Sequence, residues 1–311
     1  MSRPYLTLLF VITSFSGWAQ LRTFSLGIFT GITTSYTYDD GIGKDQRYQS
    51  RYDVKFAPIG INYGIDFDNV GILLSPGLTT IGQNFQVVNT TGGHEGIRKI
   101  NLQYLNIPIA CKLRLIDMSF FRVSVIGSVS VAYLLKGKES ISHDDAKLKF
   151  LDEIVPPVLP PDYIREYDGV LSPAVSNYTM LTKNDFKSMQ FFVAAGLRSD
   201  WDMSETWRVS FDLRLNYGLL EPRNNAYLTQ LSGYQTLYDI SGSRRDMFVQ
   251  FTIGIAKIVE VEKNASDKRK KICISTPARN NMPMQMIRNP RAGHGPMIQP
   301  KVHALTLQYS I

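Results

Sequence analysis

The 311-residue sequence has little of what marks a soluble enzyme or a helical membrane protein. Only two cysteines, four histidines and 20% charged residues are present. After the N-terminal segment, no apolar run reaches the roughly 18 residues that a transmembrane helix needs. Glycine-rich phosphate-binding patterns are absent, and no cluster of His, Cys and acidic residues has metal-ligand spacing. We therefore expect no metal and no cofactor.

The four histidines leave little scope for acid–base catalysis, which normally needs a His beside a nucleophile or a carboxylate. His94 and His143 fall in predicted loops, and His143 begins an HDD sequence that is more typical of a solvated turn than of a metal site. His294 and His303 lie in the C-terminal segment. We assign no catalytic residue and do not expect an enzyme; a lipid-modifying hydrolase at a membrane rim is the second candidate class.

The N-terminal sequence MSRPYLTLLFVITSFSGWAQ has the three-part pattern of a secretory signal. Arg3 supplies the positive charge, an apolar stretch follows, and Gly17 and Ala19 are the small residues before the cleavage site. The pattern predicts removal of residues 1–19 and export of the rest, with a buried core helix as the alternative.

The net charge of +7 lies mainly at the C-terminus. Residues 259–311 contain nine basic and three acidic residues, so we predict a basic periplasmic tail. Lys268, Arg269, Lys270 and Lys271 form a patch that suits anionic lipid headgroups or a periplasmic or secretion-machinery protein. A solvated charge run is the alternative, and nucleic acid is not an expected partner of an exported chain.

An alternation of apolar with small or polar side chains recurs along residues 20–258, as on one-sided β-strands. In WRVSFDLRLNYGLLE, Val209, Phe211 and Leu213 share one face, whereas Ser210 and Asp212 share the other. Each stretch reaches the roughly 9–11 residues that a tilted strand needs to cross a bilayer. The eight stretches are residues 23–38, 59–67, 70–85, 104–115, 120–135, 189–201, 207–221 and 247–255.

The connections between these stretches alternate between short and long, the longest running from Lys136 to Lys187. Short turns on one side and long loops on the other are typical of bacterial outer-membrane barrels. The barrel must close, because lipid cannot satisfy the backbone groups of a free sheet edge. The sequence predicts an all-β fold, an eight-stranded antiparallel up-and-down transmembrane β-barrel with a C-terminal extension, in the outer membrane of a Gram-negative bacterium.

A soluble lipocalin-like barrel with its apolar face inward is the alternative fold. The hydrophilic face, however, is rich in Gly, Ser, Ala and Asn, which suit a narrow lumen better than a water-exposed surface. We expect the charged residues of this face to form an ion-pair network that fills the lumen, with an anion path as the less favoured interpretation. These residues are Asp66, Lys112, Arg114, Arg122, Arg198, Arg208, Asp212 and Arg214.

The stretch LQYLNIPIACKLRL resembles the Tyr-Leu-x-Ile-Pro-x-x-x-Lys strand of the PorT-like outer-membrane β-barrel proteins of Bacteroidetes. The matching residues are Tyr104, Leu105, Ile107, Pro108 and Lys112. The similarity covers about residues 22–257 and implies an outer-membrane barrel. The resemblance does not by itself imply an activity. Because a few members serve type IX secretion or gliding machinery, an accessory role in such machinery is one expectation for this chain.

Pro108 lies in the middle of this strand although proline cannot donate to a β-ladder. Parity points its ring into the lumen, where a bulge would leave the neighbouring carbonyl to Lys112 or Arg122. In a closed barrel, Pro108 must therefore interrupt the ladder between paired strands.

We expect a structural or binding component that acts through its long loops and its tail. The proline and tyrosine residues of the loop at 136–187 suit a binding surface, although a disordered cover is an equal alternative. Outer-membrane lipid is the other expected partner. Three questions stay open: whether Cys111 and Cys273 pair, whether residues 302–311 add a strand, and the oligomeric state.

Overall fold

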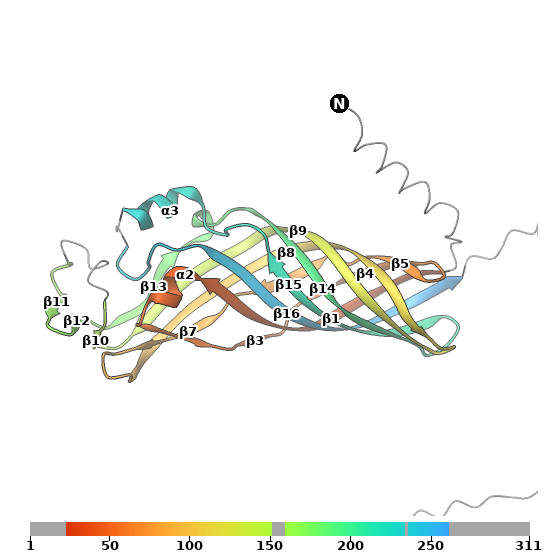
Figure 1. Ribbon diagram of the computed structural model, residues 1–311, viewed down its shortest axis with the longest axis horizontal. Coiled ribbons are helices and arrows are strands. Elements are labelled where there is room, and N and C mark those ends of the chain that lie inside the picture. Colours follow the sequence, from red (N-terminus) through yellow and green to blue (C-terminus); the bar gives the residue numbers. More distant parts are fainter. Residues whose placement is uncertain (1–22, 151–158, 234–235, 261–311) are drawn as a thin grey trace, which may run out of the picture. The chain divides into compact units, whose positions relative to one another are not determined.

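The computed structural model describes residues 23–150, 159–233 and 236–260, in which long antiparallel strands form a closed barrel (Figure 1). Each strand pairs with the next, and the last strand pairs with the first, from Thr23 opposite Glu260 to Asp39 opposite Arg244. The eight positions around the barrel are occupied by β1 (Thr23–Asp39), β4 (Ile59–Asp66), β5 (Val70–Leu74), β8 (His94–Asp117), β9 (Phe121–His143), β14 (Met189–Asp202), β15 (Trp207–Gly218) and β16 (Arg244–Glu260).

The barrel sheet contains thirteen strands rather than eight, because the predicted strand at 70–85 is interrupted and because short strands also form in segments predicted to be loops. The second position comprises β2 (Tyr48–Arg51), β3 (Val54–Lys55) and β4, and the third comprises β5, β6 (Gly77–Ile81) and β7 (Asn84–Val88). The thirteenth strand, β13 (Val175–Leu181), pairs with β9. Pro58 and Pro76 stand at two of the breaks, where a ladder donor is missing. The predicted all-β antiparallel barrel is confirmed.

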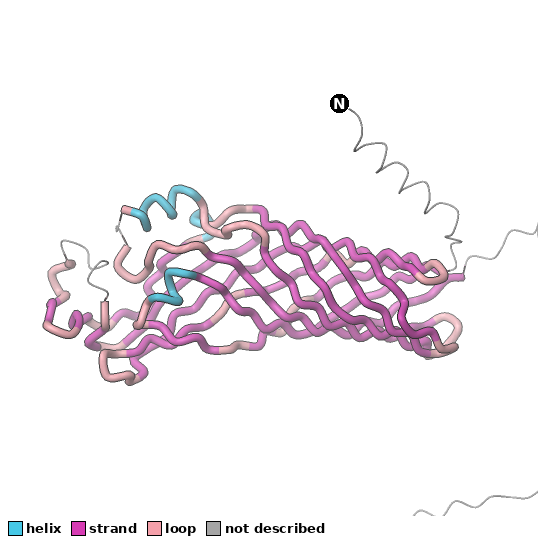
Figure 2. The backbone as a smooth tube through the Cα atoms, in the orientation of Figure 1, coloured by secondary structure: helices cyan, strands magenta, loops and turns pink. Residues whose placement is uncertain are grey.

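The remaining elements lie at the end of the barrel that carries the long connections (Figure 2). They are β10 (Ala146–Leu148), β11 (Ile164–Glu166) and β12 (Gly169–Ser172), which form a small second sheet, the helices α2 (Asp40–Lys44) and α3 (Asn225–Ser232), and the 3-10 helix η1 (Lys183–Asp185). Side chains cap the starts of both α-helices: Asp39 accepts from Gly41 N, and Asn224 accepts from Tyr227 N. No helix in the described ranges has the length and apolar character needed to cross a membrane.

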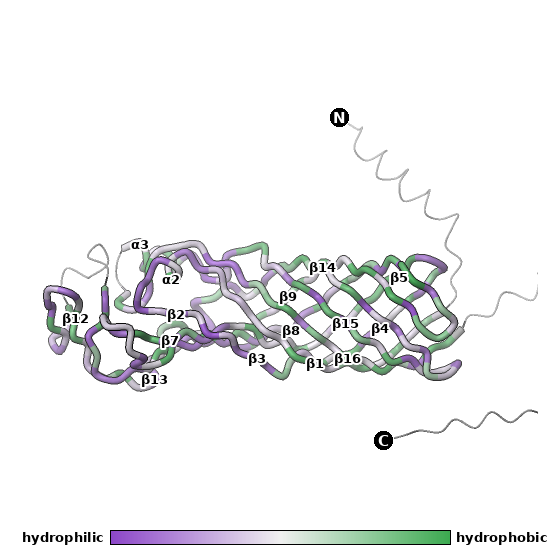
Figure 3. The backbone as a smooth tube through the Cα atoms, turned by 60° about the horizontal axis from the view of Figure 1, so that its bottom comes forward, coloured by the Kyte–Doolittle hydropathy of each residue, from purple (hydrophilic) through white to green (hydrophobic). Residues whose placement is uncertain are grey.

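The apolar face of the strands points outward, as predicted. On β15, Phe211 and Leu213 are 36% and 47% exposed, whereas Ser210 and Asp212 are 2% and 3% exposed. Figure 3 shows the hydrophobic residues concentrated in the part of the barrel that lies toward the short turns. Exposed aromatic residues flank this apolar band on the loop side and on the turn side, as girdles at two membrane interfaces. They include Tyr36, Tyr133 and Tyr217 on one side and Phe120, Trp201 and Trp207 on the other.

Strands β8 and β9 continue well beyond the apolar band, with 24 and 23 residues respectively. The predicted boundary at Leu135 is therefore wrong, and the predicted loop 136–187 contains the end of β9 together with β10 to β13. The prediction failed because the sequence alternation breaks at Leu135, where the two strands shift register.

Pro108 has its ring in the lumen, as the parity predicted, but the ladder is interrupted on the neighbouring strand. Pro108 is opposite Ser130 on β9 in regular register, so no bulge occurs there. On its other side, the Ser75 N–H donates to the Pro108 carbonyl at 3.2 Å, and Pro76 then separates β5 from β6. Both prolines lack an N–H group, so they remove their ladder donors at the same place in the sheet.

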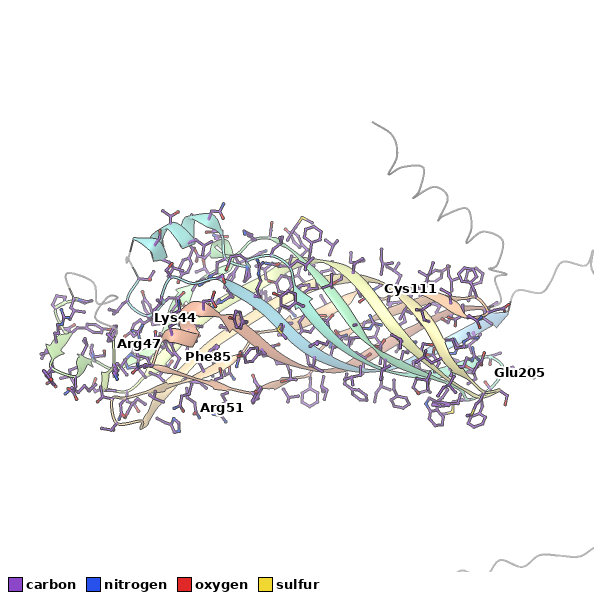
Figure 4. The ribbon with its side chains drawn as sticks, in the orientation of Figure 1. Lys44, Arg47, Arg51, Phe85, Cys111 and Glu205 are labelled. Carbon is purple, nitrogen blue, oxygen red and sulfur yellow. The ribbon has the colours of Figure 1, made fainter. Side chains whose placement is uncertain are left out.

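The described barrel ends at Glu260, so residues 259 and 260 of the predicted tail belong to β16. The predicted signal peptide, the basic patch at 268–271, Cys273 and residues 302–311 lie outside the described residues. Cys111 is a free thiol on the outer face of β8 (Figure 4).

Candidate functional site

The turn-side half of the lumen contains a network of ion pairs. Lys112 Nζ lies 2.5 Å from Asp66 and 3.6 Å from Asp200, and Arg208 donates to the same Asp66 at 2.6 Å. Arg208 also donates to Asp202 at 2.7 Å. One carboxylate on β4 thus joins cations from β8 and β15 across the barrel, and all of these groups except Asp202 are almost completely buried.

A second part of the network surrounds Asp212. Arg198 donates to Asp200 at 2.8 Å and to Asp212 at 3.4 Å, and Arg214 donates to Asp212 from the same strand. Near the turns, Arg114 pairs with Asp117 at 2.7 Å, whereas Arg122 pairs with Asp202. The structure thus gives each of the eight predicted lumen residues a charged partner.

Sequence reasoning missed three acidic members of this network, Asp117, Asp200 and Asp202. Asp200 lies in the predicted stretch 189–201, whose alternation is blurred, Asp202 follows that stretch, and Asp117 lies in the predicted turn at 116–119. The sequence did contain an indication of these residues: the predicted lumen cations outnumber the predicted lumen carboxylates, and buried cations need acidic partners.

Beyond the ion pairs, large apolar side chains fill the lumen. Tyr104 from the motif strand packs edge-on against Phe192 with ring centroids 6.1 Å apart, and Phe192 packs against Phe248 at 5.4 Å. All three rings are almost fully buried, together with Ile81 and Leu102. The apolar layer thus follows the ion pairs along the lumen, and a cavity of about 290 Å³ lined by Arg122, Asp202 and Arg208 opens at the turn side.

A β-bulge in β9 changes the direction of every side chain that follows it. Tyr104 is opposite Leu134, but Gln103 is opposite Lys136, so Leu135 has no partner on β8. Before the bulge, Ala132 and Leu134 point inward; after it, Glu139, Ile141 and His143 do. One additional residue therefore brings Glu139 into the interior, as bulges commonly re-aim side chains.

Glu139 lies at the centre of a buried cluster, here called the arginine cluster, which comprises Arg47, Arg98, Arg223 and Arg244 with their acidic partners. Arg98 Nε donates to Glu139 at 2.6 Å, and Arg244 Nη1 donates to it at 2.9 Å. The guanidinium of Arg98 also binds Asp239 at 2.9 Å, and that of Arg244 binds Asp39 at 2.7 Å. These side chains are fully or almost fully buried, beyond the apolar band.

The arginine cluster connects loops to strands. Arg47 binds Asp45 and donates to the Leu237 carbonyl at 3.0 Å, and Arg223 donates to Glu221 at 2.8 Å and to the Gly242 carbonyl at 2.6 Å. The described residues of the connections at 40–47 and 219–243 are thereby linked to one another and to β1, β8, β9 and β16. These connections, together with the small sheet β10–β12–β11, are here called the cap.

The charges of the arginine cluster are mutually stabilised. Burial alone would raise the pKa of Asp239, but Arg98, Arg244 and Arg223 outweigh it and lower the pKa to about 2. For Glu139, burial is likewise opposed by Arg244 and Arg98, which lower its pKa. These carboxylates stay ionised and hold the loops at neutral pH.

His143 is engaged within this cap. Its Nε2 lies 2.9 Å from the hydroxyl of Tyr238, which lies 2.6 Å from the hydroxyl of Tyr163, and its Nδ1 lies 2.8 Å from the Asp144 carbonyl. Burial raises the pKa of the Tyr238 hydroxyl, and the hydrogen bond to Tyr163 raises it further. His94 is exposed at the start of β8. Among the described residues, no group of three His, Cys, Asp or Glu side chains could hold a metal ion.

The sequence matches the family model described as outer membrane protein beta-barrel domain over residues 18–221, more than half of the chain. The chain belongs to this family. This outer-membrane barrel therefore has its apolar band in the lipid, and the soluble carrier considered from the sequence is excluded. By the convention of such barrels, its short turns face the periplasm and its cap faces outward.

Solved structures of outer-membrane proteins resemble this outer-membrane barrel at low identity. OprG from Pseudomonas aeruginosa is 12% identical, with 78% of this chain and 98% of that chain covered and a TM-score of 0.36. The protease OmpT from Escherichia coli is 9% identical, with 78% of this chain and 97% of that chain covered and a TM-score of 0.35. Ail from Yersinia pestis is 9% identical, with 76% of this chain and 98% of that chain covered and a TM-score of 0.31. No curated protein matches. Identities this low indicate nothing about the activity of the barrel.

The motif strand of the barrel divides its residues between two environments. Tyr104, Pro108 and Lys112 are buried in the lumen, in the apolar layer, at the ladder gap and in the ion-pair network respectively. Leu105 and Ile107 are exposed on the outer face, in the apolar band. The motif thus describes the architecture of this strand, and its residues do not come together in a surface site.

Proposed function

We propose that this outer-membrane barrel is a binding component that does not conduct solutes and that engages a protein partner through its extracellular cap. The proposal is supported by the filled lumen. The apolar layer of Tyr104, Phe192 and Phe248 lies between the ion-pair network and the arginine cluster, so a solute would have to displace buried, paired groups.

The observation that carries the proposal is a set of exposed apolar side chains in water at the tip of the cap. The sheet β10–β12–β11 lies far from the short turns (Figure 1), and Ile164, Tyr167 and Leu171 are exposed there, Tyr167 completely. Large exposed apolar groups outside the lipid mark interaction sites, and tyrosine is enriched in protein interfaces.

The base of this tip is attached to the barrel, so the tip is presented on a fixed support. The Thr90 N–H donates to the Lys147 carbonyl at 2.9 Å, and the Asp144 N–H donates to the Glu95 carbonyl at 2.9 Å. Leu148 and Val170 are buried beneath the sheet. Little conformational entropy would then be lost when a partner binds.

The resemblance of the motif strand to PorT-like proteins suggests the class of partner. We propose a component of type IX secretion or gliding machinery, with the basic tail at 268–271 as a second contact on the periplasmic side.

Site-specific photo-cross-linking in living cells tests this proposal. A photoreactive amino acid at position 167 should give a defined cross-linked adduct, and the same group at Glu205 in a periplasmic turn serves as the control. The double substitution Ile164→Ser and Leu171→Ser should remove the adduct at 167 while the folded band on gels persists.

Two results would contradict the proposal: an adduct at 167 that survives the double substitution, or steady ion conductance of the purified protein in planar bilayers. Truncation after residue 260 tests the tail separately. Loss of a secretion or gliding phenotype in the truncated strain, with the adduct at 167 retained, would assign the tail its own partner.

A further inference from the structure

We propose that the outer face of β8, β9 and the segment before β14 binds the phosphates of a phosphorylated glycolipid in the outer leaflet. This surface, here called the lysine patch, comprises Lys99, Lys136, Lys138 and Lys183, with Lys187 at its edge. The first four side chains are exposed, and Lys187 is half-buried.

The bulge at Leu135 creates the lysine patch. Without it, the parity that directs Val131 and Tyr133 outward would direct Lys136 and Lys138 into the barrel. With it, Lys136 is beside Gln103 and Lys138 is beside Asn101 on the outer face. Lys99 lies two positions before Asn101 on β8, so three ammonium groups and the amides of Asn101 and Gln103 share one surface.

None of these lysines pairs with a described acidic residue, which distinguishes them from the buried cations of this protein. The neighbouring Glu139 points inward to Arg98 and Arg244. Asp185 accepts hydrogen bonds from the backbone and hydroxyl of Thr182. The patch therefore carries uncompensated positive charge, which favours an anionic ligand.

The position of the patch relative to the membrane identifies the ligand. Leu105, Tyr133 and Met189 lie on the same outer face immediately below it, in the apolar band. Lys183 Nζ lies 6.0 Å from the centre of the Tyr133 ring, so cation and girdle are adjacent. A cation at this depth lies at the level of the outer-leaflet headgroups, where phosphate is the strong anionic acceptor, and polybasic clusters beside a membrane bind such headgroups.

Native mass spectrometry of the full chain in detergent tests the proposal, with diphosphoryl lipid A as the probe. The variant K99Q/K136Q/K138Q/K183Q should weaken retention of lipid A by about tenfold or more. The variant K44Q/R51Q/K149Q/K257Q removes the same charge from exposed positions on other surfaces and should stay within about twofold of the wild type. Figure 4 shows Lys44 and Arg51 on the segment that contains α2 and β2.

Two further arms define the chemistry. Lipid A without its phosphates should bind as weakly to the wild type as intact lipid A binds to the quadruple variant. Inorganic phosphate at millimolar concentration should not displace lipid A, because a free anion has no acyl chains to contact the apolar band. High salt should weaken wild-type binding, since exposed charges are screened.

Equal binding by the wild type and the quadruple lysine variant would overturn the proposal, as would equal losses in both quadruple variants. Displacement by inorganic phosphate would also overturn it, in favour of a soluble anion. Heat-modifiable migration on gels verifies that each variant is folded. The double variant K99Q/K183Q, which leaves β9 unchanged, should lose an intermediate amount of affinity and provides an independent measurement.

Discussion

Replacement of Glu139 by alanine is the most direct test of the arginine cluster. Its carboxylate is fully buried and accepts from Arg98 at 2.6 Å and from Arg244 at 2.9 Å. The substitution would leave Arg98 with Asp239, and Arg244 with Asp39, as their remaining carboxylate partners. Two buried guanidinium groups would each lose half of their compensating charge.

Removal of one member of a buried ion pair costs about 3–5 kcal/mol, because the remaining charge stays buried. Since both arginines keep one partner, we expect a loss near the lower limit, about 3 kcal/mol of unfolding free energy. Urea titration of the refolded protein in detergent, followed by the fluorescence of Trp201 and Trp207, measures this loss. Glu205→Ala removes the same side chain from an exposed turn and should change stability by less than about 0.5 kcal/mol.

The dependence on pH provides a second readout for the same variant. Arginine partners lower the pKa of Glu139 from its ordinary value of 4.5, so its contribution is present above that value. The contribution is lost as the pH falls through the lowered pKa of the folded protein. Wild-type stability should therefore decline on acidification below about pH 4.5, and Glu139→Ala should show a shallower decline. A loss below about 1 kcal/mol together with an unchanged acid profile would refute the reasoning.

Three further predictions concern the lumen, the membrane orientation and catalysis. Asp212→Ala should lower the temperature at which the folded band disappears on gels, because Arg198 and Arg214 both donate to this carboxylate; an unchanged temperature would exclude Asp212 from the network. Spin labels should collide with oxygen in lipid when placed at Leu213 but not when placed at Ser210, and the reverse pattern would invert the two faces. The double variant His94→Ala and His143→Ala should leave the phenotype of the strain intact, whereas loss of a lipid-hydrolysing activity would indicate a rim enzyme.

The sequence predicts the membrane-spanning half of the barrel well because its physical demands repeat every second residue. On β15, unbroken alternation from Trp207 to Tyr217 assigns every side chain to lipid or lumen. Asp212 is recognisable in this way because a charge between apolar neighbours can only point inward. The same reasoning places the ring of Pro108 in the lumen, although it does not locate the ladder break at Pro76.

The cap resists prediction because its order comes from contacts between residues distant in sequence. Arg47, Arg98, Arg223 and Arg244 look like surface cations, since nothing near them in sequence indicates burial. Arg47 and Arg223 each have a carboxylate partner two residues away, but the partners of Arg98 and Arg244 on β1, β9 and the connection before β16 are brought to them only when the barrel closes. The parity change at Leu135 hides Glu139 as well, because alternation extrapolated from Val131 directs this residue to the lipid.

The unpaired residue of β9 makes the number of residues in that strand as important as their identity. Deleting Leu135 would keep every other amino acid and still reverse the facing of the part of β9 that follows. Lys136 and Lys138 would then point toward the buried arginines, and Glu139 would point toward the lipid headgroups. A point substitution at the same position would leave both surfaces in place. The length of this one strand thus links the interior of the cap to the part of the wall that meets the outer leaflet, and neither could change its orientation without the other.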